Sequence, residues 1–106
     1  MNLWQEIKQL EGQTLHTLDH SNPFDILSVD RSKVTVRPHA TDKERSVPWP
    51  QLENAFRELS VRGEISRVEI EHQHSPRNPA YVAAILAELP GVTHKTKPIR
   101  LFYWTR

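Results

Sequence analysis

The residues best suited to a chemical role are basic side chains near the C-terminal end of the chain. Their positive charges could bind phosphate. Lys95, Lys97 and Arg100 lie close together after a Pro-Gly break. Arg77 and Asn78 precede a proline, a pattern typical of a helix N-terminus, where free backbone N–H groups and the helix dipole favour an anion. These five residues are therefore the predicted nucleic-acid contacts.

The distribution of charge gives this prediction a context. The formal net charge of +1 predicts nothing about partners. Residues 1–71 carry 9 Lys/Arg and 12 Asp/Glu, however, whereas residues 72–106 carry 5 and 1. The basic C-terminal third is either chance scatter or a surface for a polyanion. A handful of phosphate contacts, as the residues named above could make, predicts weak and salt-sensitive binding without sequence specificity.

The histidines offer an alternative chemistry. His16 and His20 form one pair in the sequence, and His72 and His74 form another. A metal site needs three or four ligands within reach, and the chain has no cysteine to supply a thiolate. Surface histidines are therefore the favoured interpretation, and no metal or cofactor is predicted. A small metal-dependent hydrolase stays a weaker alternative.

Carboxylates could in principle support nuclease chemistry. Asp25, Glu69 and Glu71 have side chains suited to Mg²⁺, but no lysine follows at the expected short spacing. The chain also has no serine elbow and no evident pair of catalytic carboxylates. We therefore predict a protein that is not an enzyme.

Length and composition bound the architecture. A chain of 106 residues is expected to form one domain with one core. Its first ten residues include Glu6 and Lys8, so they resemble neither a signal peptide nor a membrane span. The expectation is a cytoplasmic protein without membrane contact.

Residues 1–47 are predicted to form a platform made of a helix and a small antiparallel β-meander. Apolar residues from Leu3 to Leu10 recur at helical spacing, and Gly12 follows where that helix would end. The expected strands are Thr14–Leu18, Phe24–Val29 and Val34–Val36. Residues 39–46 are polar throughout, which indicates an exposed loop or the end of a hairpin.

Residues 48–106 begin with two predicted helices. Pro50 suits the first position of a helix whose apolar residues recur from Leu52 to Leu59, with Gly63 beyond its end. Ser66 and Glu69 have the spacing of a capping box.

The second of these helices has further support and one competitor. Ile65 and Ile70 have the spacing of a hydrophobic staple around a helix that begins at Ser66. Alternation of Val68, Ile70 and His72 with glutamates makes a strand the competing interpretation, and we favour the helix.

A third helix and a hairpin complete the chain. The helix Ala80–Leu89 is apolar almost all round, so it is expected to be mostly buried. After Pro90-Gly91, Val92 and the segment Ile99–Trp104 would form a β-hairpin with Lys95 and Lys97 at its tip.

The order of these elements from residue 50 to residue 104 resembles that of winged helix-turn-helix domains. The resemblance rests on element order and caps, not on a diagnostic motif. Together with the meander expected from residues 1–47, it predicts an α+β fold in which the meander precedes a winged-helix-like half. It would give Tyr81 and its neighbours on the third helix a base-reading role. That helix lacks Arg, Lys, Asn and Gln, however, so direct base readout is not predicted.

Aromatic residues provide the second hypothesis for function, a protein-interaction adaptor. Phe102 and Trp104 would share one face of the last strand and Tyr103 the other, mostly within a core. If Trp49, Tyr81 or Tyr103 were exposed, each could anchor a partner protein. DNA or RNA, any sequence preference and the oligomeric state are left open.

Overall fold

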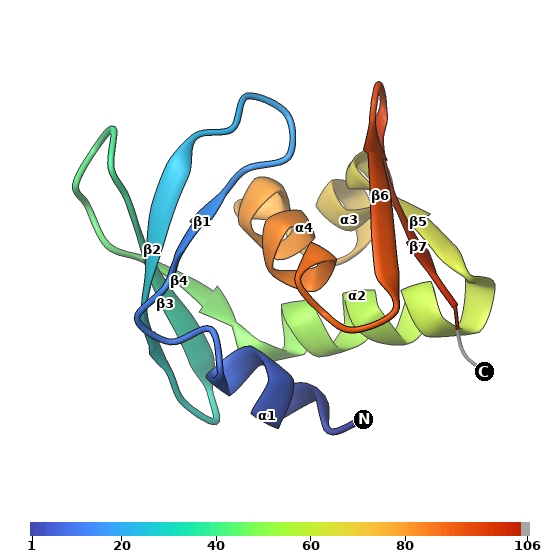
Figure 1. The fold of residues 1–106 in the computed structure, drawn as a ribbon, viewed down its shortest axis with the longest axis horizontal. Coiled ribbons are helices and arrows are strands. Elements are labelled where there is room, and N and C mark those ends of the chain that lie inside the picture. The colour runs from blue at the N-terminus through green and yellow to red at the C-terminus, as the bar shows by residue number, and fades with distance from the viewer. Residues whose placement is uncertain (105–106) are drawn as a thin grey trace.

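The computed structural model describes residues 1–104 as an α+β protein (Figure 1). Its helices are α1 (Leu3–Lys8), α2 (Trp49–Arg62), α3 (Arg67–Gln73) and α4 (Pro79–Ala87). Its strands are β1 (Thr14–His16), β2 (Pro23–Val29), β3 (Lys33–Pro38), β4 (Arg45–Pro48), β5 (Glu64–Ser66), β6 (Val92–Thr96) and β7 (Ile99–Tyr103). The N-terminal helix and the meander were both predicted.

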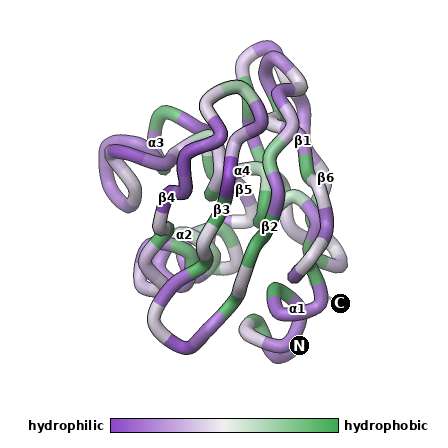
Figure 2. The backbone as a smooth tube through the Cα atoms, turned by 90° about the vertical axis from the view of Figure 1, so that its left-hand side faces the viewer, coloured by the Kyte–Doolittle hydropathy of each residue, from purple (hydrophilic) through white to green (hydrophobic). Residues whose placement is uncertain are grey.

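The first sheet is an antiparallel meander in the order β1-β2-β3-β4. Three of its strands were predicted, but β4 was not, and its first two residues lie in the segment 39–46 expected to be a loop or a hairpin end. Its Val47 pairs with Val34 and is fully buried, whereas its neighbours Ser46 and Pro48 are exposed. One apolar residue gives no alternation to detect, and Figure 2 shows β4 as largely hydrophilic.

The second sheet has three strands in the order β5-β7-β6. Strand β5 was also missed, because Glu64 and Ile65 were placed in the connection between two helices and Ser66 at the start of the second. Ser66 pairs with Arg100 in the sheet and at the same time caps α3. A strand of three residues next to a strong helix signal leaves no periodicity of its own.

The predicted caps at Gly63 and at Ser66 with Glu69 are confirmed, whereas Asn78 occupies the N-cap position of α4 without a side-chain cap hydrogen bond. Gly63 ends α2 in the left-handed conformation, with φ 83°, which glycine adopts without steric cost. At α3, Ser66 Oγ accepts from the Glu69 N–H, and Glu69 Oε1 accepts from the Ser66 N–H. The segment Arg67–Gln73 is helical, so the helix and not the competing strand is correct, and Ile65 and Ile70 around its start are both fully buried.

Helix α4 lies between the two sheets (Figure 1). Its residues from Val82 to Leu86 are buried, as predicted for a helix that is apolar almost all round. Tyr81 packs edge-on against Phe24 of β2, with ring centroids 5.0 Å apart. One hydrophobic cluster therefore contains residues of both sheets and of the helices.

Candidate nucleic-acid interface

The predicted hairpin is present, and we call residues 92–103 the wing. Strands β6 and β7 are antiparallel, with Lys95 opposite Arg100 and Thr96 opposite Ile99. Lys97 and Pro98 form the tip, whereas Lys95, also predicted at the tip, lies within β6, because the strand continues to Thr96. The wing therefore brings together three of the five residues predicted to contact nucleic acid.

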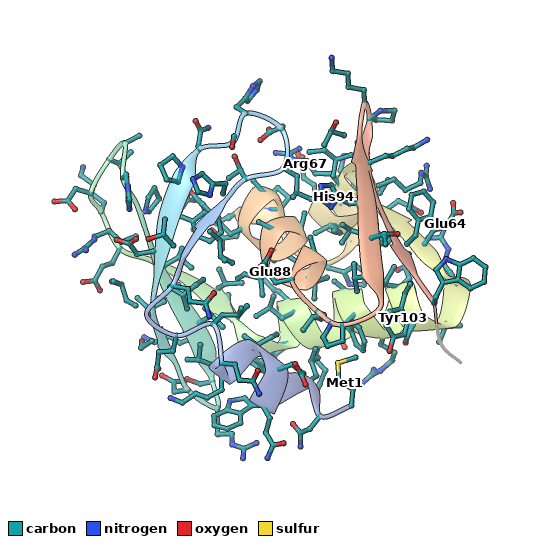
Figure 3. The ribbon with its side chains drawn as sticks, viewed as in Figure 1. Met1, Glu64, Arg67, Glu88, His94 and Tyr103 are labelled. Carbon is teal, nitrogen blue, oxygen red and sulfur yellow. The ribbon has the colours of Figure 1, made fainter. Side chains whose placement is uncertain are left out.

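The sheet β5-β7-β6 has an apolar inner face. Ile99 and Leu101 of the central strand are buried, and Leu101 lies between Ile65 and His94. Figure 3 shows His94 on the side of α4 and Glu64 on the opposite side. Because side chains alternate along a strand, Arg100 and Phe102 must point away from the helices.

That opposite side is the outer face, and it combines basic and aromatic side chains. Register places Glu64, Phe102 and Thr93 in one row, and Arg100 beside Lys95 in the next. The Trp104 N–H donates to the Gly91 carbonyl at 3.2 Å, which continues the ladder by one residue. The outer face therefore consists of residues Glu64, Thr93, Lys95, Arg100, Phe102 and Trp104.

The cations of the wing differ in their partners. Arg100 Nη1 lies 2.7 Å from Glu64 Oε1, which offsets its charge. Lys95 and Lys97 are exposed, and neither forms an ion pair with a residue between Met1 and Trp104. The two lysines are therefore the groups of the wing most available to an anion.

A cavity of about 550 Å³ lies between the wing and the start of α3. Its lining residues are Asp19, Ser66, Arg67, Val68, Thr96, Pro98, Ile99 and Arg100. Arg67 Nη1 donates to Glu71 at 3.3 Å, while its Nε is buried without a hydrogen-bond partner among residues 1–104. Sequence reasoning missed Arg67, because nothing in the chain relates the first turn of α3 to the wing.

Arg77 and Asn78 lie elsewhere, beside β4. The Arg77 carbonyl accepts from Arg45 Nη2 at 3.1 Å, while the Arg77 side chain is exposed. Asn78 is only 6% exposed, and its Nδ2 donates to the Ser46 carbonyl at 3.2 Å. This burial argues against a phosphate contact through the Asn78 side chain.

The aromatic residues predicted as protein anchors are all partly buried. Trp49 Nε1 donates to Glu53 at 3.4 Å, and Tyr81 packs on Phe24. Tyr103 packs edge-on against Phe56 of α2 at 5.2 Å. The most exposed aromatic residue between Met1 and Trp104 is Trp104 itself, at 72%.

The histidines and carboxylates form pairs and small networks. His74 Nε2 lies 2.8 Å from Glu58 Oε1, whereas His16, His20 and His72 are exposed. Within residues 1–104, no group of three or more His, Asp or Glu side chains gathers closely enough to hold a metal ion.

The three carboxylates considered for Mg²⁺ have separate partners. Hydrogen bonds from Thr14, then His39 and Arg37, lower the pKa of Asp25 from 3.8 to about 2. Bonds from the Ser66 N–H and Arg62 lower the pKa of Glu69 from 4.5 to about 2. Glu71 accepts from Arg67. Each carboxylate therefore acts within a local ion pair or cap.

Comparisons with protein families, curated proteins and solved structures found no match. Among the described helices, none has the length and apolar character needed to cross a bilayer. Functional inference therefore rests on the geometry of the site.

Proposed function

We propose that this protein is a non-enzymatic binding module that contacts nucleic acid phosphates through its wing. The observation that carries the proposal is the exposure of Lys95 and Lys97 on one hairpin without compensating carboxylates. Lysines of this kind attract phosphate and release its counterions. Arg100 and Arg67 line one cavity beside them, but each is paired with a glutamate, so the two lysines supply most of the attraction for phosphate.

Element order supports a winged-helix-like role within this proposal. From α2 to β7 the order is helix, strand, two helices and hairpin, with β7 central in the sheet. In the winged helix-turn-helix domains that the chain resembles, the third helix enters the major groove. Here α4 is buried between the sheets, which favours backbone contact through the wing over base readout.

The test is a fluorescence-anisotropy titration of labelled mixed-sequence duplex and single-stranded oligonucleotides at low and moderate salt. Lys95→Glu/Lys97→Glu should abolish binding at moderate salt, because it replaces two attractive groups with two repulsive ones. Loss of two contacts also lowers the salt slope by roughly 1.4 to 1.8. Lys33→Glu/Lys43→Glu changes the same charge on the exposed meander surface and should leave affinity nearly unchanged.

Two outcomes would contradict the proposal. One is equal loss of affinity in the two double variants, which would indicate dependence on net charge alone. The other is no binding of wild type to duplex or single strand at low salt.

A protein-interaction adaptor is the second candidate, and exposed apolar side chains favour it. Val61 is 81% exposed and Trp104 72% exposed, and they line neighbouring depressions that share Arg62. Apolar contact would be insensitive to salt, whereas phosphate contact weakens steeply with it. Once a ligand is found, the salt dependence of its affinity therefore separates the nucleic-acid module from the protein adaptor.

A further inference from the structure

We propose that the outer face of the sheet β5-β7-β6 binds single-stranded nucleic acid by stacking bases on Phe102 and Trp104. This inference rests on the proposed function and names its ligand class. Arg100 and Lys95, in the adjoining row of the same face, would then lie beside the backbone of the bound strand.

Phe102 lies in the central strand β7, and Trp104 directly follows its last residue, with the Trp104 N–H continuing the ladder, so alternation places both rings on the outer face. Phe102 is partly exposed, and Trp104 is 72% exposed. Gly91 allows this arrangement, since a Cβ there would lie 3.1 Å from the Trp104 carbonyl oxygen and 3.2 Å from the Tyr103 ring. Gly91 therefore packs closely against the Trp104 backbone and the Tyr103 ring, while the Trp104 side chain is exposed to solvent.

Spacing favours a single strand over a duplex. Residues two apart on a strand are separated by roughly 6.6 to 6.8 Å. Stacked nucleotides along one strand of a duplex rise by only about 3.4 Å. Each ring would therefore stack on one base of an extended single strand. The bases of a duplex are already stacked on their neighbours, so they would not be free to reach either ring.

A depression of about 320 Å³ lies beside both rings, which is within the usual range for ligand sites. It is lined by Arg62, Gly63, Glu64, Phe102, Tyr103 and Trp104. Arg62 is already paired with Glu58 and Glu69, and Glu64 with Arg100. Stacking must therefore supply most of the affinity here, with the attraction of phosphate coming from Lys95 and Lys97.

Charge distinguishes this ligand from a protein partner. Aromatic platforms flanked by basic side chains are typical of proteins that bind single strands without sequence preference. On the outer face the only acidic side chain among the described residues is Glu64, and Arg100 pairs with it. A polyanion with exposed bases complements both features of this face.

The experiment compares Trp104→Leu with Trp104→Phe in anisotropy titrations of a labelled single-stranded DNA, a single-stranded RNA and a duplex. The leucine keeps apolar surface but has no ring, whereas the phenylalanine keeps a ring. Loss of one stacked base corresponds to roughly a 5- to 150-fold loss of affinity. We expect this loss for Trp104→Leu on single strands only, with Trp104→Phe retaining most of the affinity.

The outcomes separate the two proposals. If Trp104→Leu binds single strands as wild type does while Lys95→Glu/Lys97→Glu does not bind, the stacking inference is overturned and the proposed function stands. If wild type binds neither single strands nor duplex, both fail. Because Trp104 is exposed, its variants should keep the wild-type circular dichroism spectrum. The DNA and RNA arms show which single strand is preferred.

Discussion

The two sheets pack on opposite sides of the same helix, α4, but the charged side chains on their outward faces have different partners. On the meander, Asp25 accepts from Thr14 at 2.6 Å, lies 2.9 Å from His39, and lies 3.3 Å from Arg37. On the sheet β5-β7-β6, Lys95 opposes Arg100 without an acidic partner of its own among the described residues. On the meander face the carboxylate of Asp25 is held in a hydrogen-bonded network, although Lys33 is also exposed there, whereas the outer face of the second sheet leaves Lys95 and the Trp104 ring to solvent.

We propose that this difference separates a surface that serves stability from one that serves binding. A closed network of hydrogen-bonded charges gains little from a ligand, because a ligand would have to displace partners already in place. An exposed lysine pair has no carboxylate partner to give up when it meets phosphate, and the contact releases counterions. We therefore infer that the meander supports α4 and that the wing meets the partner.

Phenylalanine substitutions on the two sheets should show the largest contrast. Phe24 is fully buried against Tyr81, so Phe24→Ala should lower the free energy of unfolding by about 3 to 5 kcal/mol. Phe102 on the outer face is only partly buried, so Phe102→Ala should cost clearly less. Urea unfolding at low temperature measures both values.

A milder variant keeps this comparison measurable if Phe24→Ala does not fold. Phe24→Leu removes less buried volume and should cost less than the alanine, yet it should still loosen α4 through Tyr81. Faster amide hydrogen exchange in α4 would show that coupling. Equal costs for Phe24→Ala and Phe102→Ala would mean that the outer face is part of the core.

Local signals in the sequence predicted most of the helices and their ends. Gly63 and the pair Ser66 and Glu69 act within a few residues, so their effect does not depend on the rest of the fold. Strands β4 and β5 were missed because each is short and gains its partner from a distant segment, such as Val47 from Val34. Strand pairing with a distant segment produces no recognisable pattern within a run of three or four residues.

The candidate site was predictable only in part, for the same reason. Lys95, Lys97 and Arg100 are neighbours in sequence, so the hairpin alone brings them together. Arg67 joins Arg100 only through the pairing of β5 with β7. Likewise, the meander packs on α4 through the contact of Tyr81 with Phe24. No local sequence pattern predicts that contact.

A smaller effect should come from the cap that links β5 to α3. Ser66→Ala removes the acceptor for the Glu69 N–H and should lower the free energy of unfolding by about 1 kcal/mol. Ser60→Ala is the control, because Ser60 lies within α2, where alanine is the better helix former. Thermal and urea unfolding should rank the cap variant below wild type and the control at or above it.

That cap also bears on the wing, because Ser66 is opposite Arg100 in the sheet and precedes Arg67. If α3 frays, Arg67 loses its place in the cavity beside the wing. Affinity for nucleic acid should then fall slightly in Ser66→Ala and not in Ser60→Ala. Lower stability without any change in affinity would show that Arg67 takes no part in binding.

The smallest effect concerns acid stability, and it compares one carboxylate from each half. The pKa values of Asp25 and Glu69 are lowered from 3.8 and 4.5 to about 2. A lowered pKa means that the folded state favours the ionised carboxylate, so each group stabilises the fold above its ordinary pKa. That contribution is lost as the pH falls from about 4.5 towards 2. Both side chains are partly exposed, so solvent screening keeps the effect modest.

Asp25→Asn and Glu69→Gln should therefore each flatten the fall in urea midpoint between pH 5 and pH 2, while lowering the midpoint at neutral pH. Curves parallel to wild type would show that the carboxylate is not stabilised in the fold. If Asp25→Asn flattens the curve and leaves affinity for nucleic acid unchanged, the meander network serves stability alone. Weaker binding in that variant at neutral pH would instead place the meander in the interface, and the contrast between the two outward faces would no longer hold.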